Sequence, residues 1–177
     1  MPVGETAPAP AKGNLMAGKR GLIMGVANDR SIAWGIAAAC AAQGAELAFT
    51  YQGDALEKRV RPLAASVGAK LVVPCDVSDD ASMDSAFAAL RGEWPEGIDF
   101  LVHAIGFADK AYLRGRYVDT PREVFLQAMD ISCFSFTAVA ARLGDDAPGR
   151  LAADAELSRR RAGDAALQCD GCGQGRS

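Results

Sequence analysis

Hydrophobic and polar positions along the chain follow two alternating periods. A short apolar run over residues 22–24 ends at a glycine, and after a loop Ile32, Ile36 and Cys40 recur at the spacing of one helix face. This order predicts a strand, a turn and a helix. Three more such units follow, with strands over 47–51, 71–73 and 100–102 and with helices from Asp54, through Met83, Phe87 and Leu90, and from Pro121.

Strands that alternate with helices predict a parallel sheet, because the helix that connects two parallel strands must lie against a face of the sheet. We therefore expect an α/β fold with a Rossmann-type, doubly wound parallel sheet that is incomplete and has about four strands. The last helix is expected to begin at Pro121, with Thr120 as its cap, and to run to about Ala141. A sheet of this size exposes an apolar edge and apolar faces.

Both ends of the chain lack this pattern. Residues 1–18 hold three prolines among alanine, glycine and lysine without any regular period, which is typical of a flexible extension. Residues 144–177 contain no Ile, Val, Met, Phe, Tyr or Trp and only three leucines, so this tail cannot supply a core strand. We divide the chain into an extension over residues 1–18, a folded portion over 19–143 and a largely disordered tail over 144–177.

The composition indicates one globular domain, since half of the 177 residues are hydrophobic and the net charge is −3. Without a basic stripe, the chain lacks the electrostatic footprint of a nucleic-acid binder. No apolar run approaches the roughly 20 residues of a membrane-spanning helix, and no cleavable apolar leader opens the chain. We therefore expect no membrane segment and a cytoplasmic location.

Cysteine usage gives neither a disulfide framework nor a metal signal. The five cysteines are an odd number without a secretory signal, so free thiols are expected, and Cys75 at a strand end is interpreted as an inert thiol. Cys169 and Cys172 form one C-x-x-C motif, but the tail has no histidine and no second pair to complete a structural zinc site. We expect no metal.

The first strand end gives the first chemical clue. A strand that ends in Gly25 and leads into a helix places backbone N–H groups and the helix N-terminus where a pyrophosphate binds. The spacing is not G-x-G-x-x-G, because five residues separate Gly25 from Ser31 and the next glycine is Gly35. A structural turn with Ser31 as a helix cap is an open alternative from these residues alone.

The other strand ends extend the same hypothesis. Gln52 follows the second strand, where the adenosine ribose is read, and no arginine occurs until Arg59, which favours NADH over a cofactor with a 2′-phosphate. Asp76 and Val77 follow the third strand, within reach of an adenine, and residues 104–106 follow the fourth, beside the ribose and nicotinamide. All lie at carboxyl ends of strands, where ligands bind in open α/β sheets.

Six blocks in this order carry a family resemblance. They are Gly25-Val26-Ala27-Asn28, Ser31-Ile32-Ala33-Trp34-Gly35, Thr50-Tyr51-Gln52, Cys75-Asp76-Val77, His103-Ala104-Ile105-Gly106-Phe107 and Met129-Asp130-Ile131-Ser132. Over residues 15 to about 141 the chain resembles the NADH-dependent enoyl-acyl-carrier-protein reductases of bacterial fatty-acid synthesis, which are divergent short-chain dehydrogenases.

The resemblance implies an oxidoreductase of lipid metabolism that reduces the double bond of an enoyl-acyl-carrier-protein thioester with NADH. It implies contacts with NADH/NAD at Gly25, Ser31, Ile32, Gln52, Asp76, Val77 and Ile105, and a substrate contact at Ala108. The homotetramer usual in the family is not carried over, because this chain largely lacks the helices that build it. A non-catalytic NAD-binding fragment and another short-chain dehydrogenase are the alternatives.

The resemblance also implies a catalytic tyrosine with a lysine seven positions later, after a fifth strand. Only Tyr51 and Lys58 have this spacing, and they flank the expected adenosine site, so we interpret the pair as accidental. His103, at the end of an apolar strand, is interpreted as a structural histidine. We therefore assign no catalytic residue and expect the chain to be inactive.

The tail is compatible with the missing block in a displaced reading frame. If each codon takes the last two bases of one tail codon and the first base of the next, residues 167–176 permit Tyr-Asn-Val-Met-Gly-Val-Ala-Lys-Ala, the family's Tyr-to-Lys block. In the same frame, residues 145–157 permit Met-Met-Arg-Pro-Gly-Gly-Ser-Leu-Leu-Thr-Leu-Ser, which has the pattern of a helix end, a turn and a fifth strand. We interpret residues 144–177 as a shifted-frame tail, caused by one inserted base or two lost bases between about residues 138 and 144.

Overall fold

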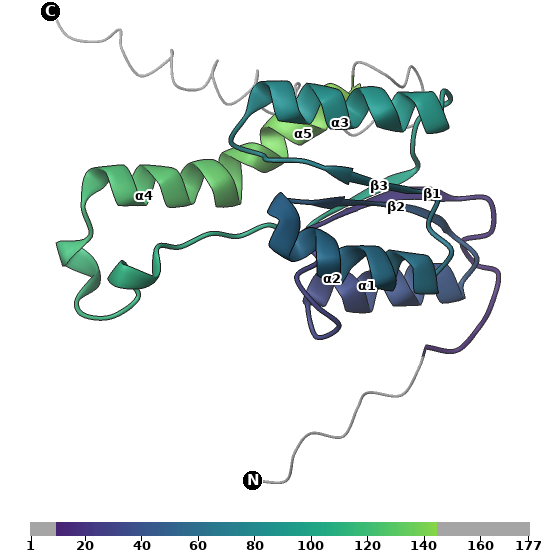
Figure 1. Cartoon of the computed structure of the whole chain (residues 1–177), viewed down its shortest axis with the longest axis horizontal. Coiled ribbons are helices and arrows are strands. Elements are labelled where there is room, and N and C mark those ends of the chain that lie inside the picture. The colour runs from purple at the N-terminus through teal and green to yellow at the C-terminus, as the bar shows by residue number, and fades with distance from the viewer. Residues whose placement is uncertain (1–9, 145–177) are drawn as a thin grey trace, which may run out of the picture.

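The computed structural model describes residues 10–144, and the interpretations that concern residues 1–9 and 145–177 lie outside this range. The described residues contain one parallel sheet in the order β3-β2-β1-β4 (Figure 1). Its strands are β1 (Arg20–Met24), β2 (Glu46–Tyr51), β3 (Leu71–Pro74) and β4 (Phe100–His103). The predicted Rossmann-type parallel sheet is confirmed.

Helices cover both faces of the sheet (Figure 1). Helices α1 (Ile32–Ala42) and α2 (Gly53–Ser66) lie on one face, and α3 (Asp80–Glu93) and α5 (Ser135–Gly144) lie on the other. Helix α2 begins one residue before the predicted Asp54, because Gly53 has φ +69° and turns the chain directly out of β2. Asp79 caps α3 by accepting a hydrogen bond from the backbone N–H of Ala81 at 3.0 Å.

The alternation of side chains along β1 divides the core into two clusters. Leu22 and Met24 point to the face that α3 covers, where they pack with Phe87, while Ile23 points to the other face and packs with Phe49. All five side chains are at most 2% exposed. The sheet is thus buried on both faces at its centre, as expected for parallel strands.

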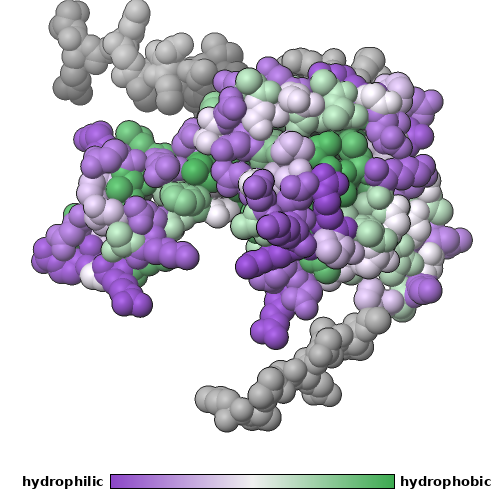
Figure 2. All heavy atoms as spheres, in the orientation of Figure 1, coloured by the Kyte–Doolittle hydropathy of each residue, from purple (hydrophilic) through white to green (hydrophobic). Residues whose placement is uncertain are grey.

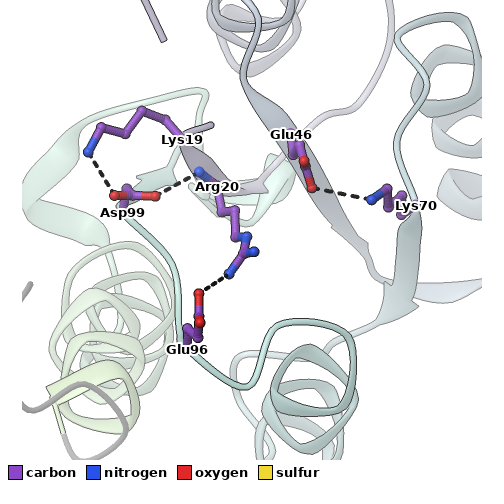
Figure 3. Close-up of polar contacts among 6 residues, drawn as sticks. All are labelled: Lys19, Arg20, Glu46, Lys70, Glu96 and Asp99. Carbon is purple, nitrogen blue, oxygen red and sulfur yellow. Dashed lines mark hydrogen bonds and ion pairs between the residues drawn. The ribbon is translucent and has the colours of Figure 1, made fainter. Parts of the chain in front are cut away.

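Charged side chains join the amino ends of β1 and β4 (Figure 3). Asp99 accepts hydrogen bonds from Lys19 Nζ and from the backbone N–H of Arg20, both at 2.9 Å. The guanidinium of Arg20 forms an ion pair with Glu96 at 3.2 Å. These contacts fix the register of the two strands at the end of the sheet opposite to the carboxyl ends.

The described part of the N-terminal extension contacts the folded region. The backbone N–H of Gly13 donates to the carbonyl of Ala42 at 2.8 Å, and that of Met16 donates to the carbonyl of Gln43 at 2.9 Å. The Gln43 side chain in turn donates to the carbonyl of Ala11 at 2.7 Å. Residues 11–16 therefore lie against the end of α1.

The last predicted helix has a different start and a wider middle. Pro121 occupies the N-cap position, with φ −60° and ψ 151°, so the predicted cap by Thr120 is wrong. The backbone of Pro121 is extended, and the helix therefore begins one residue later, at Arg122. Helix α4 (Arg122–Met129) continues through the π-helical segment η3 (Asp130–Phe134) into α5. We call residues 122–144 the long helix; it extends beyond the predicted end at Ala141.

The long helix changes one conclusion drawn from the sequence. By length and composition, residues Arg122–Leu143 are apolar enough to cross a membrane, and 11% of the most apolar window is buried. The segment is not an uninterrupted apolar run, because Asp130 lies inside it. A single helix of this kind is weak support for a membrane segment, since helices that pack inside proteins have the same composition.

Candidate functional site

A cavity of about 340 Å³ lies at the carboxyl ends of the four strands. It is lined by residues that follow each strand, which are Gly25 after β1, Gln52 after β2, Asp76 and Val77 after β3 and Ile105 after β4. Because all four strands are parallel, these five positions of the sequence meet at one edge of the sheet.

Gly25 lets the ends of β1 and β4 approach closely. Its φ is +92°, and a Cβ atom at this position would lie 2.1 Å from the carbonyl oxygen of Ala104. The backbone N–H of Ala104 donates to the carbonyl of Met24 at 3.1 Å, so the two strand ends stay paired beyond the sheet. Only glycine fits here, for reasons of both conformation and space.

The N-terminus of α1 carries backbone donors without a side-chain cap. Ser31 occupies the N-cap position, but its hydroxyl donates to the carbonyl of Asn28 at 2.7 Å and makes no hydrogen bond to the helix. The first turn of α1 contains no acidic residue. The serine therefore does not act as the side-chain cap that the structural alternative proposed, and the first-turn N–H groups can bind an anion.

Asp76 is held as a carboxylate by neighbouring donors. One of its oxygens accepts hydrogen bonds from the hydroxyl of Ser78 at 2.6 Å and from the Ser78 backbone N–H at 2.9 Å. The other oxygen accepts from the Gln52 amide at 2.8 Å. The Ser78 hydroxyl, followed by its backbone N–H, lowers the pKa of Asp76 below its ordinary value, so the group is ionised at neutral pH.

Tyr51 borders the same part of the cavity. It is 9% exposed, and its hydroxyl donates to Glu57 at 3.0 Å. Arg61 donates to the same carboxylate at 2.7 Å, and its guanidinium lies 5.5 Å from the centre of the tyrosine ring. Burial raises the pKa of Tyr51, so the phenol stays neutral and serves as a packed wall of the cavity.

His103, the last residue of β4, is anchored to the long helix. Its Nε2 lies 2.8 Å from the hydroxyl of Ser135, which itself donates to the carbonyl of Ile131 at 2.7 Å. The imidazole Nε2–H must therefore be the donor to Ser135. The ring packs edge-on against Phe136 at 5.6 Å, and burial lowers the pKa of His103. These contacts agree with the structural role expected for this histidine.

The structure places the remaining predicted residues outside the cavity lining. Ser31 and Ile32 lie at the start of α1, and Ala108 is exposed in the segment before the short helix η1 (Lys110–Tyr112). The lining also holds residues for which no contact was predicted, among them Leu56, Ser78, Gln127 and Ile131. Gln127 and Ile131 lie four positions apart on one face of the long helix, a spacing visible in the sequence but without any sign of which face meets the sheet.

The thiol that lines the cavity belongs to Cys75, which is buried. Burial raises the pKa of the Cys75 thiol from 9.0 to about 11, so the thiolate does not form at neutral pH. Within residues 10–144, no group of three or more His, Cys, Asp or Glu side chains can hold a metal ion. The C-x-x-C motif at Cys169 and Cys172 lies outside the described range.

The donors and acceptors of this site fit a dinucleotide. A pyrophosphate needs backbone N–H groups at a helix N-terminus and close access past a glycine, which α1 and Gly25 provide. An adenosine needs polar acceptors and an apolar wall, which Asp76, Gln52 and Val77 provide. The site lies where β1 is flanked by β2 on one side and β4 on the other, the point at which strand order reverses.

Comparisons with known proteins agree with this geometry. A family model described as Enoyl-(Acyl carrier protein) reductase matches residues 25–149. Enoyl-acyl-carrier-protein reductase (NADH) 2 of Rhizobium meliloti is 60% identical over 131 residues, which are 74% of this chain and 48% of the relative. The FabI reductase (NADH) of Salmonella typhimurium is 52% identical over 126 residues, 71% of this chain and 48% of the relative.

Solved structures give the same result. The enoyl-acyl-carrier-protein reductase of Anaplasma phagocytophilum, solved in complex with NAD, superposes with a TM-score of 0.73 at 55% identity, over 77% of this chain and 52% of that one. The chain thus spans about half the length of the curated relatives that it matches.

Proposed function

The chain belongs to the enoyl-(acyl carrier protein) reductase family, and from this premise we propose that residues 19–143 form the NADH-binding part of such a reductase. The reaction would be the reduction of the double bond of a 2-enoyl thioester carried by acyl carrier protein. Bound NADH supplies the hydride, and the protein orients the cofactor and excludes water.

One observation carries this proposal. The cavity at the carboxyl edge of the sheet is lined by the Gly25 turn and by the ionised Asp76 carboxylate, and the loop after Gly25 leads directly to the uncapped N-terminus of α1. Anion-binding and adenosine-binding groups beside one another match the pyrophosphate and the adenosine of a dinucleotide. The proposed cofactor contacts are Gly25, Ser31, Ile32, Gln52, Asp76, Val77 and Ile105, and the proposed substrate contact is Ala108.

We expect this chain to bind NADH without turnover. Tyr51 and Lys58, which have the seven-residue spacing, do not suit catalysis, because the Tyr51 hydroxyl is bound to Glu57 beside the adenosine end of the cavity. The displaced-frame interpretation of residues 144–177 places the Tyr-to-Lys block in another frame, and the nucleotide sequence tests it. A nucleotide sequence whose displaced frame cannot encode a Tyr-to-Lys block would contradict this interpretation of the tail.

A titration of the full chain with NADH tests the proposal. The Gly25→Ala variant should lose measurable binding, because the new Cβ would collide with the Ala104 carbonyl and shift both strand ends. Gly92→Ala is the matched control, since a Cβ there meets nothing within 4 Å and Gly92 lies in α3, outside the cavity lining. A well-folded wild-type chain that ignores NADH contradicts the proposal, as does equal binding by Gly25→Ala.

The cofactor preference can be tested in the same way. Gln52 follows β2 where a 2′-phosphate would lie, and Arg61 donates to Glu57 at 2.7 Å and is held there. We therefore expect NADH to bind at least tenfold more tightly than NADPH, a difference of about 1.4 kcal/mol. Equal affinities would contradict the role given to Gln52.

The partner and the location follow from the same family membership. We propose acyl carrier protein as the carrier of the substrate and a cytoplasmic location. Adding an enoyl thioester to the NADH-bound chain separates the alternatives, because oxidation of NADH indicates a working reductase and binding without oxidation indicates a non-catalytic NAD-binding chain. Oxidation of NADH by an added ketone, which would be reduced to the alcohol, would instead favour another short-chain dehydrogenase.

A further inference from the structure

The segment between β4 and η1 crosses the cavity and is held at two points by the long helix. Ala104, Ile105, Gly106 and Phe107 all line the cavity. At the start of this segment, His103 is bound to Ser135 at 2.8 Å. Its other end is bound to the same helix through a second serine, one turn earlier.

This second serine is Ser132, which pairs with both backbone groups of Phe107. The Ser132 hydroxyl accepts a hydrogen bond from the Phe107 N–H at 3.0 Å and donates one to the Phe107 carbonyl at 3.2 Å. The two residues are 25 positions apart in the sequence. A single hydroxyl therefore satisfies the polar groups of a loop residue that has no strand partner.

Both serines that contact the segment lie at the π-helical segment η3. Ser132 lies inside η3, and Ser135 follows directly after it. The Ser135 hydroxyl also donates to the carbonyl of Ile131, a lining residue of the cavity, at 2.7 Å. π-helical turns inside α-helices are rare and are frequently found at functional sites.

We propose that Ser132 is a positioning residue, which fixes residues 104–107 in the conformation that receives the nicotinamide half of the dinucleotide. This inference rests on the proposed function. Strand order places β4 on the opposite side of β1 from β2 and β3, so the groups that would hold adenosine lie apart from this segment. Ser132 therefore acts on one half of the cofactor site through Phe107, without lining the cavity itself.

The test compares NADH with AMP, which contains only the adenosine half. In the full chain, Ser132→Ala should weaken NADH binding about 3- to 10-fold, the effect of losing one or two hydrogen bonds that preorganise a loop. The affinity for AMP should be unchanged, because Gln52 and Asp76 keep their contacts. A general folding defect would lower both affinities and would overturn the proposal.

Two matched variants complete the titration. Ser132→Thr keeps the hydroxyl and should bind NADH like the wild type, whereas Ser66→Ala removes a helical serine hydroxyl that binds the Leu63 carbonyl away from the cavity and should change neither affinity. If Ser132→Ala binds NADH as tightly as the wild type, the positioning role is wrong. If the wild type binds neither ligand, the proposed function itself fails.

Amide hydrogen exchange gives a readout that needs no variant. In the wild-type chain without cofactor, the Phe107 amide should exchange more slowly than the Gly106 amide, because Phe107 N–H is bound to Ser132. Similar exchange rates at the two amides would show that the contact does not hold the segment, and the proposal would then be wrong.

Discussion

The core around the sheet and the long helix both contain phenylalanine side chains, but these side chains are buried in the core and exposed on the long helix. Phe49 in β2 and Phe87 in α3 are 0% and 2% exposed, whereas Phe134 and Phe136 on the long helix are 61% and 52% exposed. Helix α4 has no buried residue. Figure 2 shows hydrophobic surface on the lobe that α4 forms beside the sheet domain. Apolar composition alone therefore does not indicate where the core lies.

The difference arises from how many layers surround each element. Sheet residues are covered from two sides by helices, while the long helix packs against the core only in its second half, from Ile131 to Leu143, and α4 before it has no buried residue. An exposed apolar surface of this kind marks a region that other protein groups or a membrane can cover. The stability of the described fold should therefore depend on the sheet much more than on α4.

A matched pair of phenylalanine substitutions tests this directly. Phe49→Ala should lower the free energy of unfolding by about 3–5 kcal/mol, because it removes a fully buried ring and leaves a cavity between the sheet and α2. Phe134→Ala should change it by about 0.5 kcal/mol or less, since the ring is mostly exposed. Urea denaturation of the full chain measures both, and equal losses would contradict the comparison.

The contact between α3 and the end of the long helix should contribute less to the free energy of unfolding than the buried ring of Phe49. Arg142 donates to Asp84 at 2.7 Å and to Asp80 at 2.8 Å, with exposed carboxylates on α3. We expect the Arg142–Asp84 pair to contribute about 0.5–1 kcal/mol in a double-mutant cycle of Arg142→Gln with Asp84→Asn.

Arg116 and Asp119 provide the control for this cycle. They form a similar ion pair at 2.8 Å, but both side chains are more than half exposed and belong to the same short segment. Their coupling energy should be near zero. A coupling as large as that of Arg142 and Asp84 would show that the pair with Arg142 does not join the long helix to the sheet domain.

The smallest expected effect on stability is the pH dependence that comes from the burial of His103, which contacts Ser135. Because burial lowers the pKa of His103 below 6.5, the unfolded chain takes up a proton that the folded chain does not as pH falls below that value. Stability should therefore fall with decreasing pH from about 6.5 to the lowered pKa, and level off below it. Melting curves of the wild type and His103→Gln measure this, and the variant should lose that part of the pH dependence.

How much of the site was predictable can be seen from Gly25 and Gln127. Gly25 and Asp76 follow apolar runs, and parallel strands bring their carboxyl ends together, so both were found from the sequence. No site role was predicted for Gln127 or Ser132, because a helical period shows which residues share a face but not which face meets a loop. Ser132, which contacts Phe107, lies in the π-helical turn at η3, which no local pattern indicated.

The sequence by itself determined the order of strands and helices, the parallel sheet and the polar residues at each strand end, since these follow from local periodicity and from glycine and polar turn positions. Tertiary structure decided which of those residues meet. The sheet order β3-β2-β1-β4 places the Gly25 turn between Asp76 and Ile105, and packing of the long helix brings Ser132 to Phe107. These contacts join distant residues, so they form only when the elements pack together.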